Sequence, residues 1–416
     1  MRKKVFFKTF GCRTNLYDSQ VMMSALEEYE ITENESEADA IVINSCTVTN
    51  GADSHVRSYI SGVEKSQSGA KIFLTGCGAH TKGESLLKEK RVHGVFGQSE
   101  KQKISTLLEK EQPFYDPGDL NFVDESVVDE FIGKSRAFIK VQEGCNFRCS
   151  YCIIPYVRGD ARSMDEQKIL EQVSRLALNG FGEFILTGTN VGSYGEDKRS
   201  SLAELMKKMS QIRGVRRIRL GSVEPIQIGD SFKEILDEPW LELHMHIALQ
   251  HTSPTMLKIM NRRNVYKKDR ELFEFLAEKQ FAIGTDFITG HPGETQELWS
   301  EAMQNAAALP LTHLHAFTYS KRDGTPSAKM KPEVNGKIAK ERLHEIETLV
   351  KEKNIAFRQS INTPLDVLIE SYKDGLYHGL DQHFNKIIVD SKEDLIGNWM
   401  TIENYEVRED ANYASI

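Results

Sequence analysis

The stretch Glu143-Gly144-Cys145-Asn146-Phe147-Arg148-Cys149-Ser150-Tyr151-Cys152 places three thiols in a C-x-x-x-C-x-x-C spacing. It directly follows the apolar-rich run 136–142, which predicts a β-strand, so the thiols are expected in the loop at the strand's C-terminal end. Three thiolates from one loop can bind three corners of a cubane iron–sulfur cluster and leave the fourth iron open, whereas a structural zinc site takes four ligands. The alternatives are a zinc knuckle that lacks its fourth ligand, or buried thiols without a ligand role.

Length and composition set limits around that loop. The chain has 416 residues and a formal net charge of -8, so any binding to a polyanion must rest on local basic patches. No apolar run reaches the length of a membrane span, and the N-terminus lacks the apolar segment of a signal peptide. Six cysteines without such a segment indicate a reducing compartment, and we expect a cytoplasmic protein with no membrane association.

The other three cysteines recur at one position of a repeated pattern. A predicted strand, a cysteine and a predicted helical segment follow one another three times. The strands are expected at 5–10, 40–44 and 71–75, and the cysteines are Cys12, Cys46 and Cys77. Strand–helix alternation predicts a parallel sheet, which brings the three thiols to its carboxyl edge. Each alone would be interpreted as a buried structural cysteine, but together they predict a second three-ligand site.

The motifs around these cysteines resemble a known family. Thr9-Phe-Gly-Cys-Arg-Thr-Asn15, Asn44-Ser-Cys-Thr-Val-Thr-Asn50 and Leu74-Thr-Gly-Cys77 are similar to the N-terminal motifs of the tRNA methylthiotransferases. The loop with Cys145 and Tyr151 resembles that of the radical S-adenosylmethionine (AdoMet) superfamily. The resemblance covers nearly the whole chain.

Two of these motifs are closer to one branch of the family. Cys46-Thr-Val-Thr-Asn50 and Arg136-Ala-Phe-Ile-Lys-Val-Gln-Glu-Gly-Cys145 are similar to the MtaB-type branch, which acts on N6-threonylcarbamoyladenosine. The branch that uses isopentenyladenosine more often carries Ser-Val-Arg after its second cysteine. The branch that acts on a ribosomal protein carries a Pro-Lys-Asn-like run where this chain has Arg13-Thr-Asn15.

The resemblance implies two [4Fe-4S] clusters and AdoMet as cofactors. Cys145, Cys149 and Cys152 would hold the radical-generating cluster, and Cys12, Cys46 and Cys77 an auxiliary cluster with one open iron. A methylthio group would be added to C2 of the base adjacent to the anticodon. The implied partners are a tRNA anticodon stem-loop and an electron donor of the flavodoxin or ferredoxin type, while the sulfur donor is not identified.

The expected fold is α/β with three units. Residues 1–112 form the N-terminal parallel α/β domain, 113–134 an exposed linker rich in acidic residues, 135–357 a partial (β/α)6 radical AdoMet barrel, and 358–416 a small TRAM-like β-barrel. The barrel strands are predicted at 136–142, 183–188, 217–222, 244–249, 283–289 and 313–320, with the clearest helix at 165–178. Strands of the last unit are predicted at 365–370, 383–390 and 398–404.

Polar residues and glycines at the predicted strand ends are candidates for the AdoMet pocket. They are Tyr151, Gly188, Asn190, Ser222, Glu224 and Gln250. The alternative is that Glu224-Pro225 only shapes a turn and a helix start. The basic cluster Arg262, Arg263, Lys267 and Lys268 is a candidate RNA contact, with a solvated helix face as its alternative. His244 and His246 share one strand face, as do His313 and His315, and we interpret all four as packing residues, with a place in the lining of the barrel interior as the alternative.

Rival functions remain at this point. The chain could be a radical AdoMet enzyme whose auxiliary cluster only relays electrons. It could also be a zinc-stabilised RNA-binding module without catalysis, or a methylthiotransferase that acts on N6-isopentenyladenosine.

Overall fold

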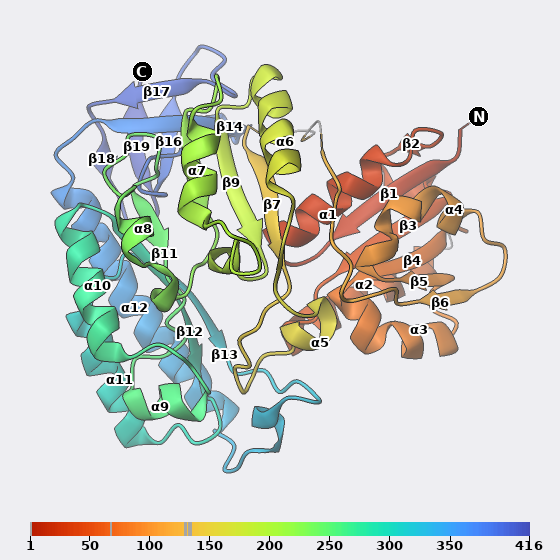
Figure 1. Cartoon of the computed structure of the whole chain (residues 1–416), viewed down its shortest axis with the longest axis horizontal. Coiled ribbons are helices and arrows are strands. Elements are labelled where there is room, and N and C mark those ends of the chain that lie inside the picture. The colour runs from red at the N-terminus through yellow and green to blue at the C-terminus, as the bar shows by residue number, and fades with distance from the viewer. Residues whose placement is uncertain (1, 67–68, 129–130, 132–134) are drawn as a thin grey trace.

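The computed structural model describes residues 2–66, 69–128, 131 and 135–416. Figure 1 shows an N-terminal sheet, a half-open barrel beside it, and a small C-terminal sheet that covers one end of the barrel.

The N-terminal sheet has six parallel strands in the order β2-β1-β3-β4-β5-β6. Their bounds are β1 Lys4–Thr9, β2 Glu30–Ile31, β3 Ala40–Ser45, β4 Lys71–Gly76, β5 Gly94–Phe96 and β6 Phe114–Asp116. The helices are α1 Arg13–Ser24, α2 Asn50–Ser66, α3 Glu84–Lys88 and α4 Ile104–Leu108. Every residue of β3 is buried, as expected of a central parallel strand covered on both faces. The three predicted strands are confirmed, and helix α1 begins directly after Cys12.

The second unit contains the six predicted parallel strands. They are β7 Ala137–Glu143, β9 Glu183–Gly188, β10 Arg217–Leu220, β11 His244–His246, β12 Ala282–Thr289 and β13 His313–Thr318. Two hydrogen-bonded groups, β10-β9-β7 and β11-β12-β13, are joined by parallel bridges from Ile218 to Leu241 and from Val223 to Ile247. The short strand β8 Arg162–Ser163 runs antiparallel along the free edge of β7. The barrel therefore stays open on that side.

Helices α6 Glu166–Leu178, α7 Leu202–Ser210, α8 Asp230–Lys233, α9 Pro254–Ile259, α10 Tyr266–Glu278, α11 Gln296–Ala308 and α12 Gly336–Ser360 surround the barrel. The short helix α5 Ile154–Arg158 instead lies at the barrel mouth, beside the N-terminal unit (Figure 1). α6 illustrates the local signals: Asp165 caps its N-terminus by accepting a hydrogen bond from the Lys168 amide at 3.1 Å. Its buried side chains recur on one face, at Ile169, Val173 and Leu176.

The N-terminal unit and the barrel share part of their core. Tyr17 of α1 belongs to the same buried apolar cluster as the barrel strands. Its hydroxyl donates to the Ser126 carbonyl at 2.7 Å. Helix α1 therefore fixes the edge of the N-terminal sheet against the barrel mouth.

The C-terminal unit is a curled six-stranded sheet, a half-barrel of the TRAM-like kind, in the order β17-β14-β15-β16-β19-β18. Its strands are β14 Leu365–Lys373, β15 Leu376–Leu380, β16 Lys386–Asp390, β17 Trp399–Ile402, β18 Glu406–Val407 and β19 Asn412–Ser415. A turn at Asp374-Gly375 joins β14 to β15, with φ of 53° and 84° at the two residues. The sheet packs on the barrel where Arg216 lies 4.2 Å over the Trp399 ring.

The segment expected to be an exposed linker is partly buried, which corrects that expectation. Phe114–Asp116 forms β6, and Asp124 and Ser126 are each only 3% exposed. The Asp124 carboxylate accepts hydrogen bonds from Lys101 and, at 2.8 Å, from Lys140. The acidic composition of residues 113–134 wrongly indicated an exposed segment, because one of its acids, Asp124, is a buried counter-ion of Lys101 and Lys140. None of the described helices has the length and apolarity required to cross a bilayer.

Candidate active site

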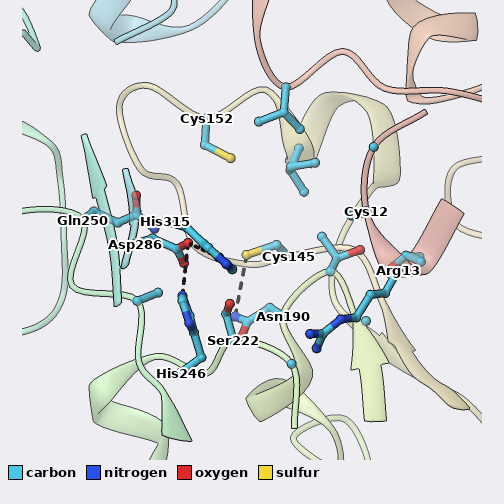
Figure 2. A pocket seen from close by; sticks show the side chains of 18 of the residues that line it. Cys12, Arg13, Cys145, Cys152, Asn190, Ser222, His246, Gln250, Asp286 and His315 are labelled. Atoms are coloured by element: carbon cyan, nitrogen blue, oxygen red, sulfur yellow. Dashed lines mark hydrogen bonds and ion pairs between the residues drawn. The ribbon is translucent and has the colours of Figure 1, made fainter. Parts of the chain in front are cut away.

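A cavity of about 630 Å³ lies between the carboxyl edge of the N-terminal sheet and the mouth of the barrel, and all six cysteines line it. Parallel strands of both units end there, which brings together thiols that are far apart in sequence. Figure 2 shows Cys145 and Cys152 around the cavity, with Cys12 and Arg13 approaching from the other unit. Both predicted trios therefore face one space.

The barrel trio comes from the single loop after β7. The chain turns at Gly144, where φ is +73° and an added Cβ would lie 1.9 Å from the Asp160 carbonyl oxygen, so only glycine fits. The Cys145 sulfur accepts a hydrogen bond from Asn190 Nδ2 at 3.7 Å. Burial raises the pKa of the Cys145 thiol, and it raises that of Cys152 to about 12.

The other trio is assembled from the ends of β1, β3 and β4. Gly11 has φ of +98°, and an added Cβ would lie 2.6 Å from Cys46 Cβ, so a side chain here would push two of the loops apart. Burial raises the pKa of Cys46 to about 11 and also raises that of Cys77. Arg158 of the barrel unit donates from Nε to the Cys77 sulfur at 3.1 Å.

These thiols fit polynuclear clusters better than single ions. Among the described residues, three ligand atoms lie within 4.8 Å of one another at His246–Asp286–His315 and at Asp18–Asp124–Glu143, but at neither cysteine trio. A cubane spreads its thiolates more widely than one zinc ion does. Buried thiolates also need positive charge, which bound iron and the nearby guanidinium of Arg158 can supply. Three thiols per trio leave one iron of each cubane without a cysteine ligand.

All six candidate AdoMet residues line the cavity: Tyr151, Gly188, Asn190, Ser222, Glu224 and Gln250. Glu224 is paired with Arg262, whose Nη1 lies 2.9 Å from Glu224 Oε1 and 3.5 Å from the Cys149 sulfur. Burial raises the pKa of Glu224 despite this arginine. Gln250 has a φ of +66°, an uncommon backbone conformation that clusters at functional sites.

The basic cluster is only partly where the sequence predicted it. Arg263, Lys267 and Lys268 are exposed, and Arg263 lies 4.2 Å over the ring of Phe147 in the cysteine loop. The Arg262 side chain is 2% exposed because it donates to Glu224 inside the cavity wall. A buried Arg262 does not fit the RNA contact predicted for it.

Three of the histidines interpreted as packing residues, His244, His246 and His315, instead line the cavity. His246 Nε2 lies 3.2 Å and His315 Nδ1 3.7 Å from Asp286 Oδ1, from three neighbouring strands (Figure 2). Although burial acts against it, these two rings lower the pKa of Asp286. The period-two spacing identified the shared strand face, but not that the face forms the cavity wall.

A buried ionic network joins the two units below the cavity, and the sequence did not predict it. The Asp18 carboxylate of α1 lies 2.8 Å from Lys101 Nζ, 3.0 Å from Lys140 Nζ and 3.0 Å from Arg158 Nη1. Arg158 Nη1 also lies 3.1 Å from Glu143, directly before the cysteine loop. Burial opposes ionisation of Asp18, but the three cations lower its pKa below the usual range.

Comparisons with known proteins agree with this two-part site. Residues 4–97 match the uncharacterized protein family UPF0004, and residues 139–306 match the radical SAM superfamily. The radical AdoMet methyltransferase TsrM from Kitasatospora setae has a similar fold, with a TM-score of 0.57, 14% identity, and coverage of 79% of this chain and 77% of that chain.

Relatives match nearly the whole chain. A putative methylthiotransferase of Helicobacter pylori is 52% identical over 417 residues, 99% of each chain. The threonylcarbamoyladenosine tRNA methylthiotransferase MtaB of Bacillus subtilis is 32% identical, over 96% of this chain and 93% of its own. The tRNA-2-methylthio-N(6)-dimethylallyladenosine synthase of Pseudothermotoga lettingae is also 32% identical, over 94% and 93%. With its two cysteine trios on one cavity and relatives along its full length, the chain belongs to the radical AdoMet methylthiotransferase family.

Proposed function

We propose that this enzyme adds a methylthio group to C2 of N6-threonylcarbamoyladenosine, next to the anticodon of tRNA. The observation that carries the proposal is the single cavity that both cysteine trios line. Of the relatives compared, several at 32–34% identity bear the name threonylcarbamoyladenosine tRNA methylthiotransferase. The cofactors are two [4Fe-4S] clusters and AdoMet.

Each unit has its own part in the proposed reaction. Residues 135–357 hold the radical-generating cluster through Cys145, Cys149 and Cys152, and residues 1–112 hold the auxiliary cluster through Cys12, Cys46 and Cys77. When bound, these groups supply a radical that removes hydrogen from C2 and the methylthio group that replaces it. No side-chain base removes an unactivated aromatic hydrogen near neutral pH, which explains why ligands for clusters dominate the site.

The protein's own side chains position the reactants. Tyr151, Asn190, Ser222 and Gln250 line the AdoMet side of the cavity, and Arg262 holds Glu224 beside Cys149. A base inside a stacked anticodon loop cannot reach both trios, so the loop must present it splayed out. The exposed Arg263, Lys267 and Lys268, together with residues 358–416, are the proposed contacts to the RNA backbone.

The proposed partners are a tRNA anticodon stem-loop and a flavodoxin- or ferredoxin-type electron donor, in the cytoplasm. The sulfur donor is not assigned.

The test is an assay of the anaerobically reconstituted enzyme on two anticodon stem-loops. One carries N6-threonylcarbamoyladenosine and the other N6-isopentenyladenosine. We expect mass spectrometry of digested nucleosides to find the methylthio product on the first substrate only. Product on the second substrate alone would assign the enzyme to the other branch, and a preparation that contains zinc and no iron would contradict the whole proposal.

A further inference from the structure

Among the described residues, four arginines line the cavity, and three of them are paired with carboxylates. The pairs are Arg158 with Asp18 and Glu143, Arg219 with Glu183 and Glu242, and Arg262 with Glu224. The fourth is Arg13, whose guanidinium makes no hydrogen bond or ion pair to any residue that the structure describes. Within the described part of the wall, Arg13 is therefore the arginine without a directly bonded carboxylate, and Glu242 is the acid that acts on it most strongly from a distance.

Arg13 lies next to the dispersed trio, which is Cys12, Cys46 and Cys77 from three separate strand ends, and its side chain reaches into the cavity. It is the first residue of α1, directly after Cys12, and Figure 2 shows its side chain pointing into the cavity. Its guanidinium lies 5.6 Å from the Phe384 ring, which forms an apolar support beneath it. Glu242, another acid in the wall, already accepts hydrogen bonds from Arg219 Nη1 at 2.7 Å and from the Leu220 amide at 2.6 Å.

An unpaired charge in a cavity wall costs free energy that an incoming anion offsets. The planar guanidinium matches a carboxylate best, because its parallel N–H groups can bind both oxygens at once. An uncharged, apolar group at the same place would remove water from the guanidinium without providing a partner. The chemistry at Arg13 therefore calls for a carboxylate.

Two carboxylates enter this cavity if the proposed function, on which this step rests, is correct. The methionine carboxylate of AdoMet is expected beside the barrel trio, Cys145, Cys149 and Cys152, whereas Arg13 adjoins the dispersed trio. The other is the threonyl carboxylate of the substrate. Positions N6 and C2 of adenine flank ring atom N1 on the same edge, so a residue that binds the N6 substituent also orients C2.

We propose that Arg13 binds the threonyl carboxylate of N6-threonylcarbamoyladenosine, and so both selects this base and orients its C2 between the two cysteine trios. The same contact disfavours an isopentenyl substituent, which carries no charge.

The experiment measures dissociation constants of the holoenzyme, with reductant omitted so that no turnover occurs. The ligands are two stem-loops that differ only in the threonyl group, one with the free carboxylate and one with its methyl ester. For the wild type we expect the acid to bind about 10- to 100-fold more tightly than the ester. Arg13→Gln should reduce this ratio to about one, and Arg13→Lys should give an intermediate ratio because it keeps a charge but loses the planar fork.

Arg57→Gln is the matched control, since Arg57 on α2 is a partly exposed arginine of the same unit whose Nη1 lies 3.5 Å from Glu89, directly after α3. It should keep the wild-type ratio. The inference is overturned if the wild-type ratio is one or if Arg13→Gln keeps the wild-type ratio. It is also overturned if Arg13→Gln weakens acid and ester equally, as a phosphate contact would, or if it weakens AdoMet binding instead.

Activity separates this inference from the proposed function. With reductant added, Arg13→Gln should raise KM for the threonylcarbamoyl stem-loop far more than it lowers kcat, with iron content and 5′-deoxyadenosine formation retained. If the wild type makes no methylthio product on that substrate, the proposed function is wrong whatever the binding ratio shows. If the wild type makes product and the ratio does not depend on Arg13, only the role of Arg13 is wrong.

Discussion

The two cysteine trios line the same cavity, but the chain builds them in different ways. Cys145, Cys149 and Cys152 lie in one loop, so local chain geometry holds them together whether or not the rest of the barrel is well packed. Cys12, Cys46 and Cys77 come from three strand ends, and the parallel register of β1, β3 and β4 alone brings them together. The second trio therefore depends on tertiary structure in a way that the first does not.

Arg158 connects the two arrangements. It donates to the Cys77 sulfur and, through Nη1, reaches both Asp18 and Glu143. The network that keeps the units in contact thus also orients a sulfur of the dispersed trio.

Removing one sulfur from each trio should have the largest effect and should separate their roles. Cys46→Ala is expected to abolish the methylthio product while AdoMet cleavage continues and about half of the iron remains. Cys149→Ala should abolish both product and cleavage. Mass spectrometry of nucleosides and of 5′-deoxyadenosine, with an iron assay, checks both variants. Normal product formation by Cys46→Ala would show that the dispersed trio only relays electrons or has no role.

Removing a cation from the interface should destabilise the arrangement on which both trios depend. Lys140 is fully buried and contacts Asp18, Asp124 and Glu143, so Lys140→Met leaves their charges undercompensated. We expect the free energy of unfolding to fall by about 3–5 kcal/mol. Urea unfolding of the apoprotein followed by circular dichroism measures it. Lys88→Met is the control, because its pair with Glu84 is exposed, and it should cost less than about 1 kcal/mol. Equal losses of unfolding free energy in Lys140→Met and Lys88→Met would mean that the buried ion pairs stabilise the protein no more than the exposed pair does.

Acid should weaken the same interface. The pKa values of Asp18 and Asp124 lie below the usual range because neighbouring lysines outweigh the cost of burial. In the acid range the unfolded chain then binds more protons than the folded one, so stability rises with pH. The contribution is fully present above the unfolded carboxyl pKa of about 4 and is lost as pH falls below it. Unfolding of the apoprotein between about pH 3 and pH 6 checks this slope, and a steeper acid loss in Lys140→Met than in the wild type would contradict it.

The smallest expected effect concerns backbone space at the dispersed trio. Gly11→Ala places a Cβ against Cys46 at a positive φ, and we expect a cost of about 1–3 kcal/mol together with weaker iron retention at the auxiliary site. Gly62→Ala in α2 has no atom within 4 Å of the new Cβ and should instead stabilise by about 0.5–1 kcal/mol. Thermal unfolding and iron content per protein compare the two. If Gly11→Ala behaves like Gly62→Ala, the three strand ends have room to adjust.

The same distinction explains what the sequence could predict. Strand periodicity and the cysteine positions were enough for the parallel sheet, the six barrel strands and both trios, because each signal lies within a short segment. The ligand proposed for Arg13 is not part of the chain, and Asp124 meets Lys140 only after folding, so neither has a local pattern. His246, Asp286 and His315 likewise meet through strand register across three elements.

Phe384 belongs to the C-terminal sheet unit, yet its ring stacks on His244 at 4.9 Å and forms part of the cavity wall. Deleting the C-terminal unit would therefore do more than remove the proposed RNA contacts, since it would also remove part of the cavity wall. A truncated enzyme that loses activity cannot be interpreted as an RNA-binding defect alone. Point substitutions on the outer face of that sheet would separate the two effects.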